Sequence, residues 1–260
     1  MAFLDIPPLT AAGSSAIPVP LPPRTDRDGK AVGSVILSEI PEDEFLVLRP
    51  VLEPVSLPRY KVLYEQGQKI EHAYFLNAGM ISLVVIASDG RSVEVGISGR
   101  EGVVGLAVAF GFNDASSRAI VQLPGSGLRI ASATLQANFL TLPWLRQATE
   151  RYTLTQQMQV AQTAACNRLH DMEQRLARWL LMCQDTTESS SLPLTHEFLA
   201  QMLGTGRPTV TLAAGVLERA GLIENTRGSV KILNRKRLED AACECYRAIQ
   251  NYRGGLALRP

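Results

Sequence analysis

The stretch LTHEFLAQMLGTGRPTVTLAAGVLERAGLIENTRGSVKI, residues Leu194–Ile232, decides the fold of this chain. It begins with Thr195, whose side chain can accept a hydrogen bond from a backbone N–H at a helix N-terminus. Four apolar residues then recur at helical spacing and predict a buried face: Phe198, Leu199, Met202 and Leu203. Gly204 predicts the end of this helix, because glycine takes the left-handed conformation there at little cost. Thr205 and Gly206 follow as a tight turn.

A second helix is predicted from Arg207 to Ala220, directly after the turn. Pro208 falls in its first turn, where no backbone hydrogen bond is lost. Its buried stripe consists of Val210, Ala213, Ala214 and Leu217. Gly221 predicts the end of the helix, and two short apolar runs over residues 222–233 predict a hairpin. Two helices, a glycine turn and a hairpin are typical of a winged helix-turn-helix, whose second helix enters the major groove of DNA.

The charge balance agrees with this interpretation only when it is counted locally. The whole chain has 260 residues and a formal net charge of +1, which excludes a strongly basic protein that coats nucleic acid. Between Leu194 and Arg237, however, seven Lys or Arg residues oppose three Asp or Glu residues. This local excess favours contacts with phosphates. The ordinary composition, 46% hydrophobic and 20% charged, excludes disordered, collagen-like and disulfide-scaffold proteins.

Upstream of the motif, residues 143–168 predict one long helix, because no Gly and no further Pro follow Pro143. A seam along one of its faces consists of Leu154, Met158, Ala161 and Ala165. An exposed seam on so long a helix favours a dimer contact. Packing of this face on the chain's own β domain is the alternative.

Residues 54–135 predict an all-β domain. Ten of the twenty glycines lie between Gly67 and Gly127, and Asp89-Gly90 is a hairpin signal. Short apolar or alternating runs predict strands over 61–64, 73–76, 81–87, 93–97, 120–123 and 128–130. Many short strands separated by glycine turns predict a barrel, roll or sandwich.

The predicted fold class is therefore α+β. A flexible proline-rich tail (1–35) is expected to precede a β-roll of double-stranded, jelly-roll-like form (36–142). The long dimerisation helix (143–169) then leads into the winged helix-turn-helix domain (170–253), and a short C-terminal tail (254–260) ends the chain. The tail prediction rests on six of the fifteen prolines, which lie within residues 1–23.

This order of elements resembles the Crp/Fnr family of bacterial transcription regulators over about residues 36–250. The resemblance is most specific in Leu194–Ile232, and it extends to VLYEQGQKIEHAYFLNAGMISLVVIASDGRSVEVGISGREGVV (Val62–Val104), which looks like a cyclic-nucleotide-binding β-roll. It implies a homodimer that binds palindromic promoter DNA through the second helix of the motif, with RNA polymerase as a further partner. It also implies that a small effector in the β-roll modulates DNA binding.

The effector site departs from the pattern of the members that bind cyclic AMP. Those members carry Gly-Glu-Leu and Arg-Ser-Ala, in which Glu holds the ribose, whereas this chain has no acid in the matching run Gly102–Gly111. The matching residues imply an effector site made of Arg118, Ser116, Ser117, Gly105, Val160 and Ala161. Cyclic AMP is therefore disfavoured, while another small effector such as a cyclic dinucleotide, or no effector, stays open.

The second helix of the motif also departs from the family. Typical members show Arg-Glu-Thr-Val-x-Arg, and here Arg207 is kept while Pro208 and Leu212 replace the Glu and the second Arg. Arg207 is expected to contact a guanine. The other predicted DNA contacts are Thr209, Thr211, Thr205, Thr195 and His196 on the helices, and Arg227 and Lys231 on the wing.

The sequence gives little support to other functional classes of protein. No common nucleophile set, Walker loop or metal-ligand spacing occurs, so an enzyme is not expected.

The four cysteines, Cys166, Cys183, Cys243 and Cys245, fit no common zinc or iron–sulfur spacing and are interpreted as reduced structural thiols, with a redox sensor as the alternative. No signal peptide or membrane span is evident, which predicts a cytoplasmic protein. The alternative function is a ligand-binding or protein-interaction module whose helix-turn-helix does not read DNA.

Overall fold

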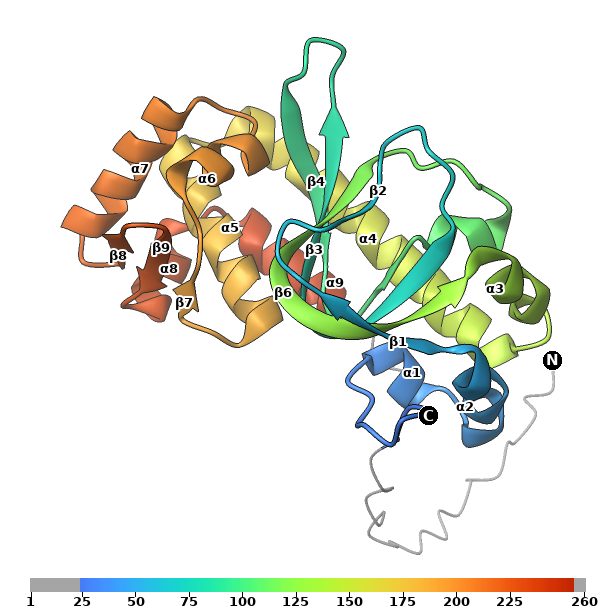
Figure 1. Ribbon diagram of the computed structural model, residues 1–260. Coiled ribbons are helices and arrows are strands. Elements are labelled where there is room, and N and C mark those ends of the chain that lie inside the picture. Colours follow the sequence, from blue (N-terminus) through green and yellow to red (C-terminus); the bar gives the residue numbers. More distant parts are fainter. Residues whose placement is uncertain (1–23, 255–260) are drawn as a thin grey trace, which may run out of the picture.

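The computed structural model describes residues 24–254, in which a curled β-sheet and a compact α-rich C-terminal part flank one long helix (Figure 1). The N-terminal helices are α1 (Val35–Glu39), α2 (Glu42–Leu48) and the 3-10 turn η1 (Arg49–Val51). The strands are β1 (Glu53–Leu57), β2 (Val62–Tyr64), β3 (His72–Ile86), β4 (Ser92–Ser98), β5 (Val103–Val104) and β6 (Arg118–Ala131). The 3-10 turn η2 (Leu106–Phe110) and helix α3 (Ser132–Phe139) complete this part.

The six strands form one antiparallel sheet in the order β1-β6-β3-β4, with β2 paired to β6 and β5 paired to β3. The prediction of a β-roll in an α+β chain is confirmed. The prediction of short strands is wrong for β3 and β6, which are 15 and 14 residues long. Gly79 and Gly125 lie inside these strands, where β3 passes close to β6 with shifts of register. A Cβ at Gly125 would lie 2.0 Å from the carbonyl oxygen of Ala78. These glycines allow the bend and do not end the strands.

The predicted tail over residues 1–35 is too long. Residues 1–23 and 255–260 lie outside the described residues, but residues 24–35 are folded. Arg24 pairs with Glu42 and stacks on Phe45, while Asp26 and Ser34 are buried. Ser34 also caps α1. Residues 24–35 therefore belong to the folded β domain.

Helix α4 (Pro143–Leu169) confirms the predicted long helix. Its N-terminus is capped from another element, because the carboxylate of Glu44 accepts hydrogen bonds from the N–H groups of Trp144 and Leu145 at 2.9 and 2.8 Å. Farther along, the Tyr152 hydroxyl donates to Ser98 Oγ of β4 at 2.9 Å. One face of α4 thus packs on the β domain.

The C-terminal part begins with α5 (Met172–Thr187), and a capping box at Asp171 starts this helix. The helices that follow are α6 (His196–Met202), α7 (Arg207–Arg219), α8 (Arg235–Ala241) and α9 (Cys245–Gly254). Strands β7 (Ser191–Leu192), β8 (Ile223–Thr226) and β9 (Ser229–Ile232) pair in the order β7-β9-β8. Among residues 24–254, no helix combines the length and apolar character that a membrane span requires.

The two parts of the chain share one hydrophobic core, in which Met80, Val84 and Ile97 of the sheet pack with α5 and α6. A polar contact lies inside this core. The indole N–H of Trp179 on α5 donates to the carboxylate of Glu94 on β4 at 2.7 Å, and the Ser82 hydroxyl donates to the same carboxylate at 2.5 Å. Glu94 is only 6% exposed. Burial raises its pKa from 4.5 to about 7, although the hydrogen bonds from Ser82 and Trp179 and the charge of Arg178 oppose this rise.

We therefore expect Glu94→Gln to flatten the pH dependence of folding stability. Because the folded-state pKa exceeds the unfolded value, the contribution of Glu94 is fully present below pH 4.5 and is lost as the pH rises through about 7. At about 1.4 kcal/mol per pKa unit, the variant should be more stable than the wild type above pH 7 by up to about 3 kcal/mol. Denaturant unfolding at pH 5 and pH 8 measures this effect, with exposed Glu224→Gln as the control. An unchanged pH dependence in Glu94→Gln would contradict the assignment.

Candidate nucleic-acid interface and effector cavity

Helices α6 and α7 form as their local sequence predicts. The Thr195 hydroxyl accepts a hydrogen bond from the Phe198 N–H at 3.2 Å and so caps α6. Gly204 has a left-handed φ of 62° at the end of α6, and Gly206 precedes α7. The predicted stripe of α7 is buried: Val210, Ala213, Ala214 and Leu217. The wing hairpin β8–β9 turns at Gly228, which has a φ of 84°.

The buried stripe leaves the opposite face of α7 open to solvent. Arg207, Thr209 and Thr211 are all exposed at its N-terminal half. Arg227 and Lys231 are exposed on the wing. These five predicted DNA contacts are therefore accessible on the two elements that the motif uses to meet DNA.

His196 connects the start of α6 to both of those elements. Its Nδ1 lies 3.1 Å from the Thr211 hydroxyl on α7, and its Nε2 lies 3.3 Å from Asn225 Oδ1 on β8. The ring is half-buried, and Thr195 is used as the cap of α6. The phosphate contacts expected of Thr195 and His196 stay a prediction, while the structure shows that both side chains make hydrogen-bond contacts within the motif.

The N-terminus of α7 borders a cleft of about 830 Å³ between the α6–α7 turn and the β3–β4 hairpin. Thr205 and Arg207 line one side, and Arg91 and Val93 line the other. A Cβ at Gly204 would lie 2.9 Å from the Val93 side chain, so the turn and the hairpin meet closely. The hairpin projects from the sheet beside the C-terminal part in Figure 1.

Two features of this surface were missed by sequence reasoning. Leu212 and Val216 are 72% and 41% exposed on the open face of α7, where apolar side chains can contact thymine methyl groups. Arg235 was counted in the local positive charge, but it pairs with Asp185 at 2.6 Å and with Glu239 at 2.9 Å. The charge of Arg235 is therefore largely compensated by acidic residues of the same domain.

A second cavity, of about 440 Å³, lies between the β domain and α4. Four of the predicted effector residues line it: Gly105, Ser116, Ser117 and Val160. Arg118 and Ala161 do not line it, and Arg118 Nε instead lies 2.6 Å from Glu65 Oε2 in an ion pair. Two of the six predicted residues are thus placed outside the cavity, and no charged side chain is among the described residues that line it.

Gln156 is a lining residue that sequence reasoning missed. Its Nε2 is buried and has no hydrogen-bond partner among the described residues. An unpaired buried donor costs free energy unless a ligand or water accepts from it. The cavity is otherwise lined mostly by apolar side chains and by Tyr64 and Tyr152, and burial raises the pKa of Tyr64 so that it stays neutral.

The predicted dimer seam is exposed in the single chain. Leu154 and Met158 are 58% and 48% exposed, and Ala161 and Ala165 are also exposed. The buried face of α4 carries Tyr152, Gln159 and Thr163. Packing on the β domain and an open apolar seam therefore coexist on different faces of this helix.

Comparison with known proteins gives two domain matches. The sequence model of the cyclic nucleotide-binding domain matches residues 54–139, and that of the Crp-like helix-turn-helix domain matches residues 174–241. The global nitrogen regulator of Synechocystis sp. (strain ATCC 27184 / PCC 6803 / Kazusa) is 26% identical over 202 residues, covering 72% of this chain and 87% of that protein.

Solved structures share the fold. One is a protein from Eubacterium rectale assigned to the Crp/Fnr family of transcriptional regulators, with a TM-score of 0.63 and 15% identity over 80% of this chain and 97% of that one. Another is the c-di-GMP-responsive global regulator CLP of Xanthomonas campestris, with a TM-score of 0.61 and 18% identity over 73% of this chain and 96% of that one. The two matched domains, in this order and on this fold, place the chain in the Crp/Fnr family of transcription regulators, which are not enzymes.

Proposed function

We propose that this regulator is a homodimer that binds a palindromic promoter site through two copies of α7. The observation that carries the proposal is the exposed N-terminal half of α7 beside a basic wing. Arg207 occupies the position from which a guanidinium can donate two hydrogen bonds to a guanine edge. Thr209, Thr205 and the wing residues Arg227 and Lys231 serve to position the helix on phosphates, and Thr211 contacts a thymine methyl group or a phosphate.

Dimerisation through α4 would supply the symmetry of the site. The seam Leu154, Met158, Ala161 and Ala165 is apolar and open, and a parallel partner helix would bury it. Two α7 helices related by a two-fold axis would then face half-sites about one helical turn apart.

The cavity between the β domain and α4 is the proposed effector site. Its volume falls in the range of small-molecule sites. Ser116 and Ser117 offer hydroxyl donors to an effector, while the uncharged lining and the ion pair of Arg118 disfavour the cyclic AMP mode. CLP of Xanthomonas responds to c-di-GMP, so a cyclic dinucleotide is one candidate class. Native mass spectrometry of the purified dimer tests whether a small molecule copurifies.

We place the protein in the bacterial cytoplasm, with RNA polymerase as a further partner. The competing function is a ligand-binding or protein-interaction module whose helix-turn-helix serves only as a docking element. The salt dependence of DNA affinity separates the two functions, because each phosphate contact releases counterions.

We expect the logarithm of the affinity to fall linearly with the logarithm of the salt concentration. The double variant Arg227→Ala, Lys231→Ala should reduce this slope by about two, since about one unit is lost per phosphate contact. Fluorescence anisotropy on duplex DNA at several salt concentrations measures both slopes, and the exposed Lys30→Ala on the β domain is the control. Absence of binding even at low salt would favour the docking module.

A further inference from the structure

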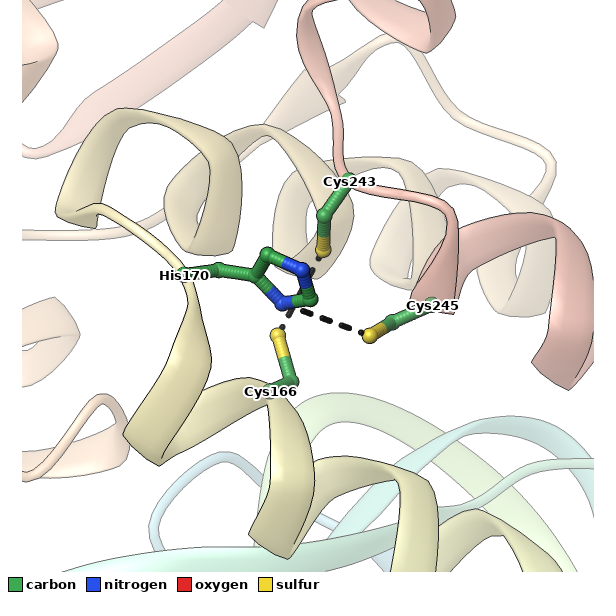
Figure 2. A group of neighbouring side chains, drawn as sticks. All are labelled: Cys166, His170, Cys243 and Cys245. Carbon is green, nitrogen blue, oxygen red and sulfur yellow. Dashed lines mark hydrogen bonds between the residues drawn. The ribbon is translucent and has the colours of Figure 1, made fainter.

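Three cysteines and one histidine that are far apart in the sequence meet at one point of the fold. Cys166 and His170 lie at the end of α4, Cys243 lies between α8 and α9, and Cys245 begins α9. Their sulfur and nitrogen atoms all lie within 4.8 Å of one another. Figure 2 shows the four side chains converging, with the imidazole of His170 among the three sulfurs. Sequence spacing gave no metal pattern because the two halves of the cluster are 77 residues apart at Cys166 and Cys243.

We propose that these four side chains bind one zinc ion as a closed Cys3His site. At a Zn–S distance of about 2.3 Å, a tetrahedral site separates its sulfurs by about 3.8 Å. Cys166 Sγ lies 3.5 Å from Cys243 Sγ, and Cys245 Sγ lies 3.5 Å from His170 Nδ1. The cluster is therefore already close to the size of a mononuclear site. An iron–sulfur cluster would hold at least some of its ligand sulfurs farther apart, because several iron and sulfide ions lie between them.

The surroundings support the same assignment. His170 Nε2 lies 3.1 Å from Glu244 Oε1, which leaves Nδ1 facing the sulfurs and gives the imidazole the carboxylate partner typical of zinc ligands. The Gln162 side-chain amide donates to Cys245 Sγ at 3.1 Å. Three thiolates around one Zn²⁺ leave a net charge of −1. Arg175 and Arg178 of α5 each have a buried Nε without a hydrogen-bond partner among the described residues.

The burial of the cluster fits a structural site. All three cysteines are buried and His170 is half-buried. The site of the metal is therefore shielded from solvent, as in a structural zinc site. His170 is also the residue at which α4 ends in extended backbone before α5 begins. A metal at this point ties the end of the dimer helix to α9 and thus fixes the connection between α4 and the DNA-binding part.

The test is the metal content of the full chain, purified in a reducing buffer and measured by inductively coupled plasma mass spectrometry. We expect about one zinc per chain in the wild type and its loss in the double variant Cys166→Ser, Cys245→Ser. Cys183→Ser is the matched control, because Cys183 is buried on α5 outside the cluster. This variant should retain its zinc. Equal zinc loss in Cys183→Ser would overturn the assignment, as would iron with acid-labile sulfide in the wild type.

A second measurement, on the wild-type protein, tests the proposal even if the cysteine variants do not fold. Wild-type protein is stripped with a chelator under reducing conditions and titrated with Co²⁺. Tetrahedral thiolate coordination predicts intense visible d–d bands and sulfur-to-cobalt charge-transfer bands that saturate at about one Co²⁺ per chain and disappear on addition of Zn²⁺. A wild-type chain with neither stoichiometric zinc nor these bands would overturn the proposal, and a Cys166–Cys243 disulfide in its place would identify the cluster as a thiol pair.

Discussion

The double variant Leu154→Glu, Met158→Glu is expected to convert the dimer to a monomer and to abolish specific DNA binding at concentrations that saturate the wild type. Both side chains are about half exposed in the single chain, so the substitutions leave the core intact. In the dimer they would place like charges on the two facing helices. Because a monomer engages only one half-site, the apparent affinity should fall by about 10²- to 10⁴-fold.

Sedimentation velocity and gel-shift titration measure the two effects together. Leu140→Glu is the control, since Leu140 is 77% exposed between α3 and α4 and lies outside the seam. It should remain dimeric and keep its DNA affinity. A Leu154→Glu, Met158→Glu protein that is still dimeric would show that another surface forms the interface.

Replacing Arg207 by alanine is expected to cost about 1–3 kcal/mol on a specific site and to relax selectivity at one base pair of each half-site. The cost arises because a two-donor contact to guanine is lost while the phosphate contacts remain. Affinity for random DNA should change little in comparison. Competition titrations with the preferred duplex and with duplexes altered at single positions measure the difference.

Arg219→Ala provides the matched comparison on the same helix. Arg219 is exposed at the C-terminal end of α7, away from the N-terminal half of α7 that we propose contacts DNA. Its loss should alter specific and random binding by the same small factor. If Arg207→Ala also weakens both kinds of DNA equally, Arg207 contacts phosphate and does not read a base.

The winged helix-turn-helix could be predicted almost completely, because its signals are local. The Thr195 cap, the left-handed Gly204 and the Pro208 in the first turn of α7 each act within a few residues of the element that they define. The buried stripe of α7 follows from its 3.6-residue period. The same reasoning located α4 within one residue at its C-terminal end.

The β domain was harder to predict from the sequence, because its glycines are required by contacts between residues that lie far apart in the sequence. Gly79 and Gly125 were interpreted as turns, but each is needed where β3 and β6 approach too closely for a side chain. The N-terminal cap of α4 comes from Glu44, about 100 residues earlier in the sequence. No local pattern indicates such a partner.

The effector cavity and the cysteine cluster also combine residues that the sequence indicates with residues that only the fold brings together. Gly105, Ser116, Ser117 and Val160, which the family resemblance assigned to an effector site, line one cavity. The ion pair of Arg118 with Glu65 joins the start of β6 to the residue after β2, a contact that only the fold creates. Gln156 is an ordinary helix residue in the sequence, and only the fold places it at the cavity wall, with its buried amide nitrogen against Gly96. The cluster of Cys166, His170, Cys243 and Cys245 likewise depends on the packing of α9 on α4.

The most direct test of a dimer that reads a palindrome is selection of binding sites from a randomised duplex library by the purified full-length protein. We predict enrichment of an inverted repeat whose half-site centres lie about one helical turn, roughly 10–10.5 base pairs, apart. Each half-site should contain a guanine whose enrichment disappears in Arg207→Ala. Recovery of no preferred sequence, or of a single site without two-fold symmetry, would contradict the account.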